Sequence, residues 1–206
     1  EEVGLGKKMT ATEAEEWNKV VARFEKVCKA AYDSDVALLI DAEESWMQDA
    51  ADHLVEEMMI KYNKSKPIVF NTLQMYRWDR LEYLKKLHDK AKQEGFFIGA
   101  KLVRGAYMEK ENERAIEKGY PTPICASKEA TDQNYDASVK YMIDHIDSMS
   151  IFEGTHNEKS TYALMDLMKE KGIESTDNRI WFGQLYGMSD NISYNLANSG
   201  YNVAKY

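Results

Sequence analysis

Several features are scarce in this sequence of 206 residues. Its two cysteines, Cys28 and Cys125, show no metal-binding or redox spacing, so we expect free thiols in a reducing compartment. No apolar run approaches the length of a membrane span. The formal net charge is -8 and no basic cluster offsets it, which argues against a nucleic-acid surface.

Two common nucleotide-binding motifs are also absent. The sequence contains neither G-x-G-x-x-G nor G-x-x-x-x-G-K-S/T, which excludes the two usual phosphate-binding loops. An apolar content of 44% and a charged content of 30% are typical of a globular protein. Because the sequence starts abruptly at Glu1 and ends at Tyr206 inside an expected strand, we expect residues 1–206 to be a single partial domain of a longer protein.

Short apolar segments alternate with amphipathic ones. Residues 1–9 show no periodicity and predict a loop, and Thr10 with Glu13 has capping-box spacing at the start of the first helix. The helix after residue 44 is expected to turn Met47 and Ala50 inward, and a later helix is expected to run from Ser127 to Met149. Strands are expected at 36–40, 68–74, 97–103, 151–155, 179–185 and 202–206. This alternation predicts a parallel α/β fold.

Polar residues gather where the expected strands end, which favours a barrel over an open sheet. A barrel brings all its strand ends to one mouth, whereas an open sheet concentrates function near one switch point. We therefore predict a (β/α)8, TIM-like barrel that is incomplete, with about six strands present and the first strands and the final helix absent. The strand-end residues are Asp41, Gln74, Lys101, Arg104, Thr155, His156, Asn157 and Gln184.

The segment from Phe97 to Tyr107 is the most informative. Small and apolar residues run almost unbroken through it, as in a strand buried on both faces. Lys101, Arg104 and Tyr107 lie near its exit, where charged groups are costly to bury without a partner. Gly105 then allows a backbone to approach a ligand closely. These features predict a functional site at this strand end.

Five motifs in order resemble the proline dehydrogenase family from about residue 10 to the end. They are D-A-E-E at 41–44, the strand-ending Gln74, K-L-V-R-G-A-Y at 101–107, T-H-N at 155–157 and G-Q-L-Y-G-M at 183–188. The resemblance implies an FAD-dependent oxidoreductase, a flavoprotein of proline catabolism. Such an enzyme oxidises L-proline to 1-pyrroline-5-carboxylate, with hydride transfer from proline C5 to flavin N5.

The same resemblance implies roles for individual residues. Asp41 and Lys101 match catalytic positions, Asp41 holding a cation or a tyrosine hydroxyl and Lys101 lying by the flavin. Tyr107, Leu185 and Tyr206 match substrate-binding positions. The cofactor-binding positions are Ala42, Gln74, Lys101, Val103, Arg104, Gly105, Ala106, Thr155, His156, Asn157 and Gln184. Since no second histidine lies within ligand spacing of His156, no metal is expected.

Simpler interpretations of these residues stay open. Asp41 suits a helix N-cap, Gln74 an ordinary loop-entry residue, and Leu185 plain barrel packing. Lys101 would also suit a Schiff-base lysine in a barrel lyase or aldolase. A third alternative is a non-enzymatic scaffold fragment without a competent site.

The family also has parts without a counterpart here. A lysine on an earlier strand and an arginine pair on the final helix, which hold the substrate carboxylate, are expected to lie outside this chain. The resemblance implies a quinone-type electron acceptor, and we expect a cytoplasmic protein, with peripheral membrane contact and homo-oligomer formation as further possibilities. Edge strands left open by the incomplete barrel are what homo-oligomer contacts would cover.

Overall fold

The protein is described by a computed structural model that covers residues 2–3 and 7–206, with side chains from residue 9 on. The strands are β1 (Glu2–Val3), β2 (Lys7–Lys8), β3 (Leu38–Ile40), β4 (Val69–Gln74), β5 (Ile98–Val103), β6 (Met149–Gly154), β7 (Ile180–Gln184) and β8 (Val203–Lys205). The helices are α1 (Ala11–Asp33), α2 (Ser45–Tyr62), α3 (Arg80–Glu94), α4 (Met108–Lys118), α5 (Lys128–Asp144), α6 (Glu158–Glu170) and α7 (Asp190–Asn198).

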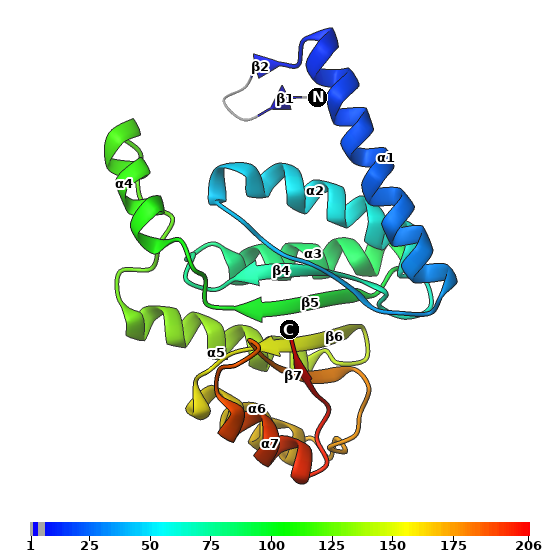
Figure 1. The fold of residues 1–206 in the computed structure, drawn as a ribbon, viewed down its shortest axis with the longest axis vertical. Helices are drawn as coiled ribbons and strands as arrows, with labels where there is room; N and C mark the ends of the chain where they lie inside the picture. The colour runs from blue at the N-terminus through cyan, green and yellow to red at the C-terminus, as the bar shows by residue number, and fades with distance from the viewer. Residues whose placement is uncertain (1, 4–6) are drawn as a thin grey trace.

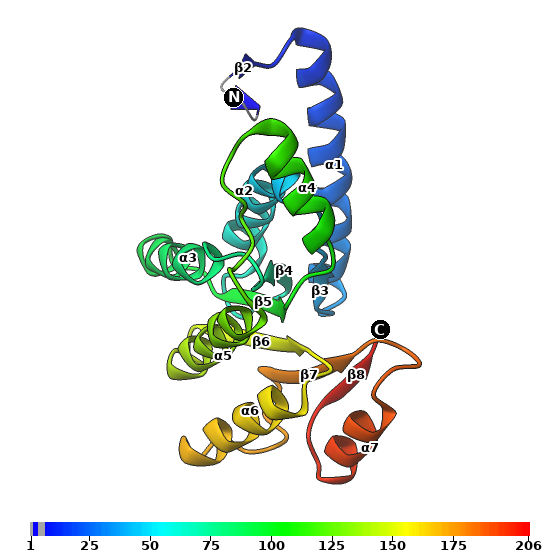
Figure 2. The same ribbon diagram turned by 90° about the vertical axis from the view of Figure 1, so that its left-hand side faces the viewer.

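Six parallel strands form one sheet in the order β3-β4-β5-β6-β7-β8. Each strand pairs with the next along the chain, and every pairing in this sheet is parallel. A doubly wound sheet would reverse its order at a switch point, whereas a barrel adds strands in one direction. The sheet curls as it proceeds, with α3, α5 and α6 on its outer side (Figures 1 and 2). The predicted incomplete (β/α)8 barrel is therefore confirmed.

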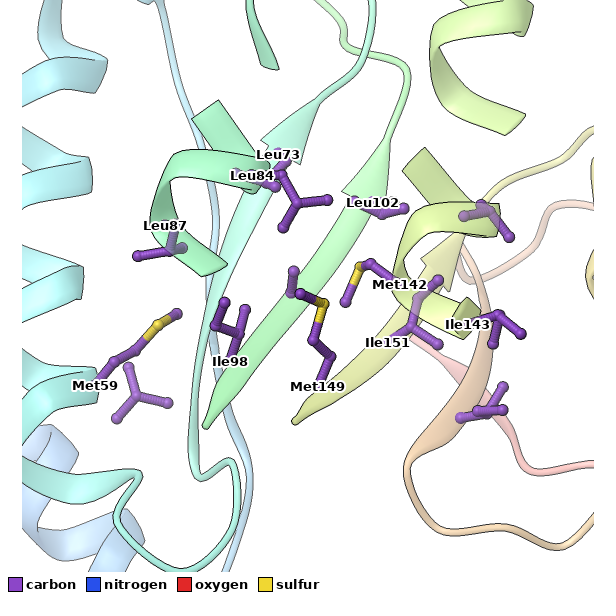
Figure 3. Close-up of a cluster of buried hydrophobic side chains, with 14 of the residues drawn as sticks. Met59, Leu73, Leu84, Leu87, Ile98, Leu102, Met142, Ile143, Met149 and Ile151 are labelled. Atoms are coloured by element: carbon purple, nitrogen blue, oxygen red, sulfur yellow. The ribbon is translucent and has the colours of Figure 1, made fainter. Parts of the chain in front are cut away.

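The hydrophobic core lies between the sheet and the helices that cover it. On β5, Ile98, Ala100 and Leu102 belong to this core and are almost completely buried. Figure 3 shows Leu84 and Leu87 of α3 and Met142 and Ile143 of α5 around them. The three β5 residues lie at every second position, as on one face of a strand, and Leu84 and Leu87 lie three positions apart, as on one face of a helix.

The concave side of the sheet alternates large and small residues. A Cβ on Gly99 would lie 2.6 Å from the ring of Phe70, and a Cβ on Gly183 would lie 2.0 Å from Phe152 Cε1. Both glycines therefore allow an aromatic ring of the neighbouring strand to lie across them. Phe152 in turn lies near Lys101, whose Nζ is 6.0 Å from the ring centre.

The capping signal predicted for the first helix is confirmed. Thr10 and Glu13 form the predicted capping box at the start of α1. Gly95 ends α3 in the left-handed conformation, with φ 67°. Part of the predicted loop at 1–9 is instead an antiparallel pairing of β1 with β2; its positions 1 and 4–6 lie outside the described residues.

Two helix predictions were wrong. Helix α5 ends at Asp144, not Met149, which instead opens β6. Met47 is half exposed on α2, and Ala50 is exposed. Asp52 of α2 is buried in their place, because its carboxylate accepts hydrogen bonds from Asn71 Nδ2 and Arg80 Nη1 at 2.8 and 2.7 Å. These partners lie on β4 and α3, so the helical pattern alone did not predict them.

Within the described residues, no helix combines the length and the apolar character needed to span a membrane.

Candidate active site

A cavity of about 970 Å³ opens at the C-terminal ends of the strands. It is the place where the barrel geometry predicts a site. Every site residue predicted from the sequence lines it except Gln184. The predicted lining residues are Asp41, Ala42, Gln74, Lys101, Val103, Arg104, Gly105, Ala106, Tyr107, Thr155, His156, Asn157, Leu185 and Tyr206.

Lys101 and Asp41 form an ion pair in this cavity. Lys101 Nζ donates to Asp41 Oδ1 at 2.6 Å, and Thr72 Oγ1 donates to the same oxygen at 3.3 Å. The Lys101 side chain is only 5% exposed, so its charge is fixed at the base of the cavity. Nζ also lies 3.9 Å from the ring centre of Tyr206, a cation–π contact. Asp41 is not the N-cap of α2, since that position belongs to Glu44.

Gln74 presents an unpartnered acceptor beside this pair. Its Nε2 donates to the backbone oxygen of Glu43 at 2.7 Å, which fixes the orientation of the amide. Its Oε1 is buried and has no hydrogen-bond partner among the described residues. Since a buried acceptor without a partner is costly, this atom is suited to a ligand that donates a hydrogen bond.

The Arg104 guanidinium is held by three side chains. It donates to Asp132 Oδ1 at 2.7 Å, to Thr155 Oγ1 at 2.9 Å and to Ser160 Oγ at 3.0 Å. Its carbon Cζ lies 4.3 Å from the centre of the Tyr135 ring. The charge of Arg104 is therefore immobilised between β5, α5 and α6 at the edge of the cavity.

The Thr155-His156-Asn157 segment leads into the N-terminus of α6. Asn157 is the N-cap, and its side chain accepts from the backbone N–H of Lys159 at 2.9 Å. His156 Nδ1 lies 2.9 Å from Ser189 Oγ. Burial lowers the pKa of His156, and nearby Lys205 adds to this. The polar side chains of Thr155, His156 and Asn157 therefore lie beside the N-terminus of α6 at this wall of the cavity.

Gly105 brings backbone to the cavity surface between Arg104 and Tyr107. Its φ is +127°, and a Cβ there would lie 2.6 Å from the Tyr76 ring. No side chain fits this position without displacing Tyr76. Tyr107 follows, and its hydroxyl donates to Glu43 Oε2 at 2.5 Å. That hydrogen bond to a carboxylate raises the pKa of Tyr107.

Gln184 does not reach the cavity. It is completely buried, its Nε2 donates to the Thr155 backbone oxygen at 3.3 Å, and its Oε1 accepts from Ser193 Oγ at 2.8 Å. Its side chain therefore ties β7 to α7 and to the segment that carries Thr155. Gln184 is the last residue of β7, but its position at the strand end does not show which face of the strand its side chain occupies.

Several residues at the cavity were missed by sequence reasoning. Glu43 directly follows the predicted Ala42, and Thr72 lies two residues before the predicted Gln74 on the same strand. The D-A-E-E motif and the strand alternation could therefore have revealed them. Lys128 and Asp132 form an i,i+4 pair on α5 that reaches Arg104, which no local pattern indicates. The missed lining residues are Glu43, Thr72, Lys128, Asp132, Gly154, Glu158 and Lys159.

Over the part of the chain that the structure describes, no three His, Cys, Asp or Glu side chains are grouped so that they could hold a metal ion. The cavity itself presents a buried cation, fixed hydrogen-bond donors and acceptors, and aromatic surfaces.

The sequence of the chain is similar to those of known proteins of one family. The proline dehydrogenase family model matches residues 2–206. Proline dehydrogenase 1, mitochondrial, of Drosophila melanogaster is 40% identical over 204 residues, covering 94% of this chain and 30% of the relative. The human protein of the same name is 37% identical over 202 residues, covering 97% of this chain and 34% of the relative. The chain thus spans about a third of the length of these relatives.

The fold has a counterpart among solved structures. Proline utilization A (PutA) from Bdellovibrio bacteriovorus, inactivated by N-propargylglycine, superimposes with a TM-score of 0.86 over 94% of this chain and 20% of its own length. Its sequence is 24% identical, so this likeness concerns the fold alone.

Proposed function

The chain belongs to the proline dehydrogenase family, and from this premise we propose that it forms the catalytic cavity of an enzyme that oxidises L-proline to 1-pyrroline-5-carboxylate, the first step of proline catabolism. In this reaction proline loses a hydride from C5 and a proton from its nitrogen. FAD, when bound, supplies the hydride acceptor. The chain's own residues bind and orient the substrate and stabilise the charge that develops during the reaction.

The cavity fits a flavin dinucleotide at two places. The unpartnered Gln74 Oε1 is an acceptor for a ring N–H, and Gly105 leaves backbone free of a side chain at the cavity surface. At the other wall, Lys128 and Lys159 line the cavity beside the N-terminus of α6. A helix N-terminus flanked by lysines suits a diphosphate, which supports FAD rather than a flavin without phosphates.

The observation that carries the proposal is the buried Lys101 ammonium, paired with Asp41 at 2.6 Å. A positive charge fixed in a cavity stabilises negative charge that develops there during hydride transfer, without reorganisation at the moment of reaction. Asp41 holds this charge in place.

Tyr206 and Leu185 are proposed to contact the substrate ring. Both are partly exposed at the cavity, at 42% each, and can bury apolar surface on a small ligand. Tyr107, which follows β5, is proposed to line the same substrate space. The lysine and the arginine pair expected outside this chain would bind the substrate carboxylate.

The test is Lys101→Met in the intact, flavin-loaded protein. Proline-driven flavin bleaching, followed by stopped-flow absorbance, is expected to slow about 10²- to 10³-fold, as when one preorganised electrostatic group is removed. Lys92→Met, an exposed change on α3, is the matched control and should leave the rate unchanged. Wild-type bleaching rates in Lys101→Met would remove the assigned role of Lys101. A borohydride-trapped adduct on Lys101 would move the Schiff-base alternative forward.

Further parts of the proposal concern the setting of the enzyme. We propose that residues 1–206 form one partial barrel domain, that a quinone-type acceptor takes the electrons, and that peripheral membrane contact and homo-oligomer contacts occur. The cytoplasmic location stays a prediction, since the two relatives described above are named mitochondrial. Cell fractionation and sedimentation of the intact protein would test location and oligomeric state.

A further inference from the structure

Helix α4 is held mainly by polar contacts. Its buried residues are Glu111 and Ala115, whereas Ile116 is 83% exposed. The helix projects away from the sheet, beyond the C-terminal end of β5 (Figures 1 and 2). A helix of this length with little apolar burial depends on side-chain contacts for its position.

Glu111 makes the central contact, and it reaches another helix. Its side chain is completely buried. Oε1 accepts from the backbone N–H of Ser45 at 2.6 Å, and Oε2 accepts from the Ser45 hydroxyl at 2.6 Å. Ser45 is the first residue of α2, and its N-cap, Glu44, makes no side-chain capping bond. The α4 carboxylate therefore caps α2 from outside, at the positive end of the helix dipole.

Further contacts join the same two segments. Tyr107 donates to Glu43, and Lys110 pairs with Glu44. The Arg114 guanidinium lies 4.3 Å from the ring centre of Trp46. Residues 107–114 are thus held against residues 43–46 by several side-chain contacts, of which the Glu111–Ser45 contact is the most buried.

These two segments also form walls of the candidate active site. Asp41 and Glu43 line the cavity just before α2, and Tyr107 lines it just before α4. Gln74 Nε2 also depends on Glu43, whose backbone oxygen it contacts. Displacement of α2's first turn would therefore change the positions of Asp41, Glu43 and Tyr107 together.

We propose that Glu111 is a positioning residue of this site. By capping α2 from α4, it holds the Asp41–Glu44 segment against Tyr107 and so fixes two walls of the substrate space. The proposal rests on the proposed function only for the identity of the substrate. The inter-helix cap itself is a property of the chain.

The first arm of the test follows amide hydrogen exchange in the intact, flavin-loaded protein. Glu111→Gln removes the carboxylate, and Glu117→Gln makes the same change at an exposed position of α4. In Glu111→Gln, exchange over residues 43–47 and at 107 is expected to rise about tenfold, the effect of losing a helix cap. Exchange in Glu117→Gln should match the wild type. Unchanged exchange in Glu111→Gln would overturn the proposal.

The second arm measures proline oxidation. In Glu111→Gln, kcat/KM is expected to fall about tenfold. Because Glu111 is proposed to act through the position of Tyr107, adding Glu111→Gln to Tyr107→Phe should reduce kcat/KM much less than it does alone. A merely structural role would lower the melting temperature and leave kcat/KM unchanged, or give independent effects in the double variant; either result overturns the proposal.

Two safeguards keep these outcomes distinct. If Glu111→Gln does not fold, Ser45→Ala removes one of the two bonds and is expected to shift both measurements in the same direction by a smaller factor. If the intact wild-type protein does not oxidise proline, the proposed function fails, while the exchange at 43–47 and 107 still decides whether Glu111 holds the two segments together.

Discussion

The two ends of the parallel strands satisfy their buried polar groups very differently. At the N-terminal end, Asn63 accepts from the N–H groups of Ile68 and Val69 and donates to the carbonyls of Val69 and Phe97, all within 2.8 to 3.0 Å. Nearby, both ring nitrogens of His88 have partners, Tyr141 Oη at 2.9 Å and Ser148 Oγ at 3.0 Å. At this end, the polar side-chain atoms of Asn63 and His88 therefore all have hydrogen-bond partners.

The opposite end contains the unpartnered atoms. In the described part of the chain, the buried side-chain nitrogens and oxygens without a hydrogen-bond partner belong to residues near or after the C-terminal ends of strands. They belong to Gln74, Tyr76, Arg77, Arg114 and Glu153. Burial raises the pKa of Tyr76 to about 12, with Glu111 adding to the effect. Of these residues, only Gln74 lines the cavity. The two ends therefore differ: Asn63 and His88 are fully paired at one end, whereas the other retains buried unpartnered groups, one of them at the candidate active site.

The largest effect is expected from the N-terminal end. Asn63→Ala would leave two backbone donors and two carbonyls at the starts of β4 and β5 without their partner. The free energy of unfolding is expected to fall by about 4 kcal/mol. Chemical denaturation followed by circular dichroism measures it, with the exposed Asn178→Ala as control. A loss below about 1 kcal/mol would contradict the conclusion that the hydrogen bonds at this end stabilise the fold.

A second prediction concerns the Glu153 carboxyl near the end of β6. Complete burial raises its pKa to about 8. The native state therefore binds this proton more tightly than the unfolded state, so the free energy of unfolding falls as pH rises from about 4.5 to about 8. Glu153→Gln stays neutral and is expected to gain about 3 kcal/mol relative to the wild type between pH 4.5 and pH 7.

Denaturation of both proteins at pH 5, 7 and 8.5 measures this difference. Glu170→Gln, at the end of α6, supplies the same chemical change at an exposed position and should track the wild type. Parallel pH curves for wild type and Glu153→Gln would show that Glu153 is not protonated in the native state at neutral pH.

The smallest effect on stability is expected at Gln74, although its effect on binding is specific. Gln74→Leu removes the unpartnered Oε1 and the hydrogen bond to the Glu43 carbonyl. Both residues line the cavity. The free energy of unfolding should change by less than about 1 kcal/mol, while the dissociation constant of FAD rises about tenfold. Fluorescence titration of the intact apoprotein measures it, beside the exposed Gln93→Leu. Equal FAD affinity would place the flavin away from Gln74.

Much of the site could be predicted because strand ends are local features. An apolar run that stops at a polar residue predicts Gln74 at the mouth, and a lysine inside an apolar strand singles out Lys101. The family resemblance adds Tyr107 and Asn157. Gln184 shows where this reasoning fails. The strand end is visible in the sequence, but the side chain turns to Ser193 and away from the cavity. Which face a last strand residue occupies depends on the twist of the strand and on the helix beside it.

By itself, the sequence determined the alternation of strands and helices, the capping of α1 and α3, and the burial of Lys101 in an apolar strand. These depend on neighbours a few residues apart, so their periodicity and capping chemistry can be read directly. The tertiary structure alone decided that Glu111 caps α2 across 66 residues and that Arg80 pairs with Asp52 across 28. Such contacts form only after the sheet has brought distant segments together, because a buried charge finds its partner in space rather than along the chain.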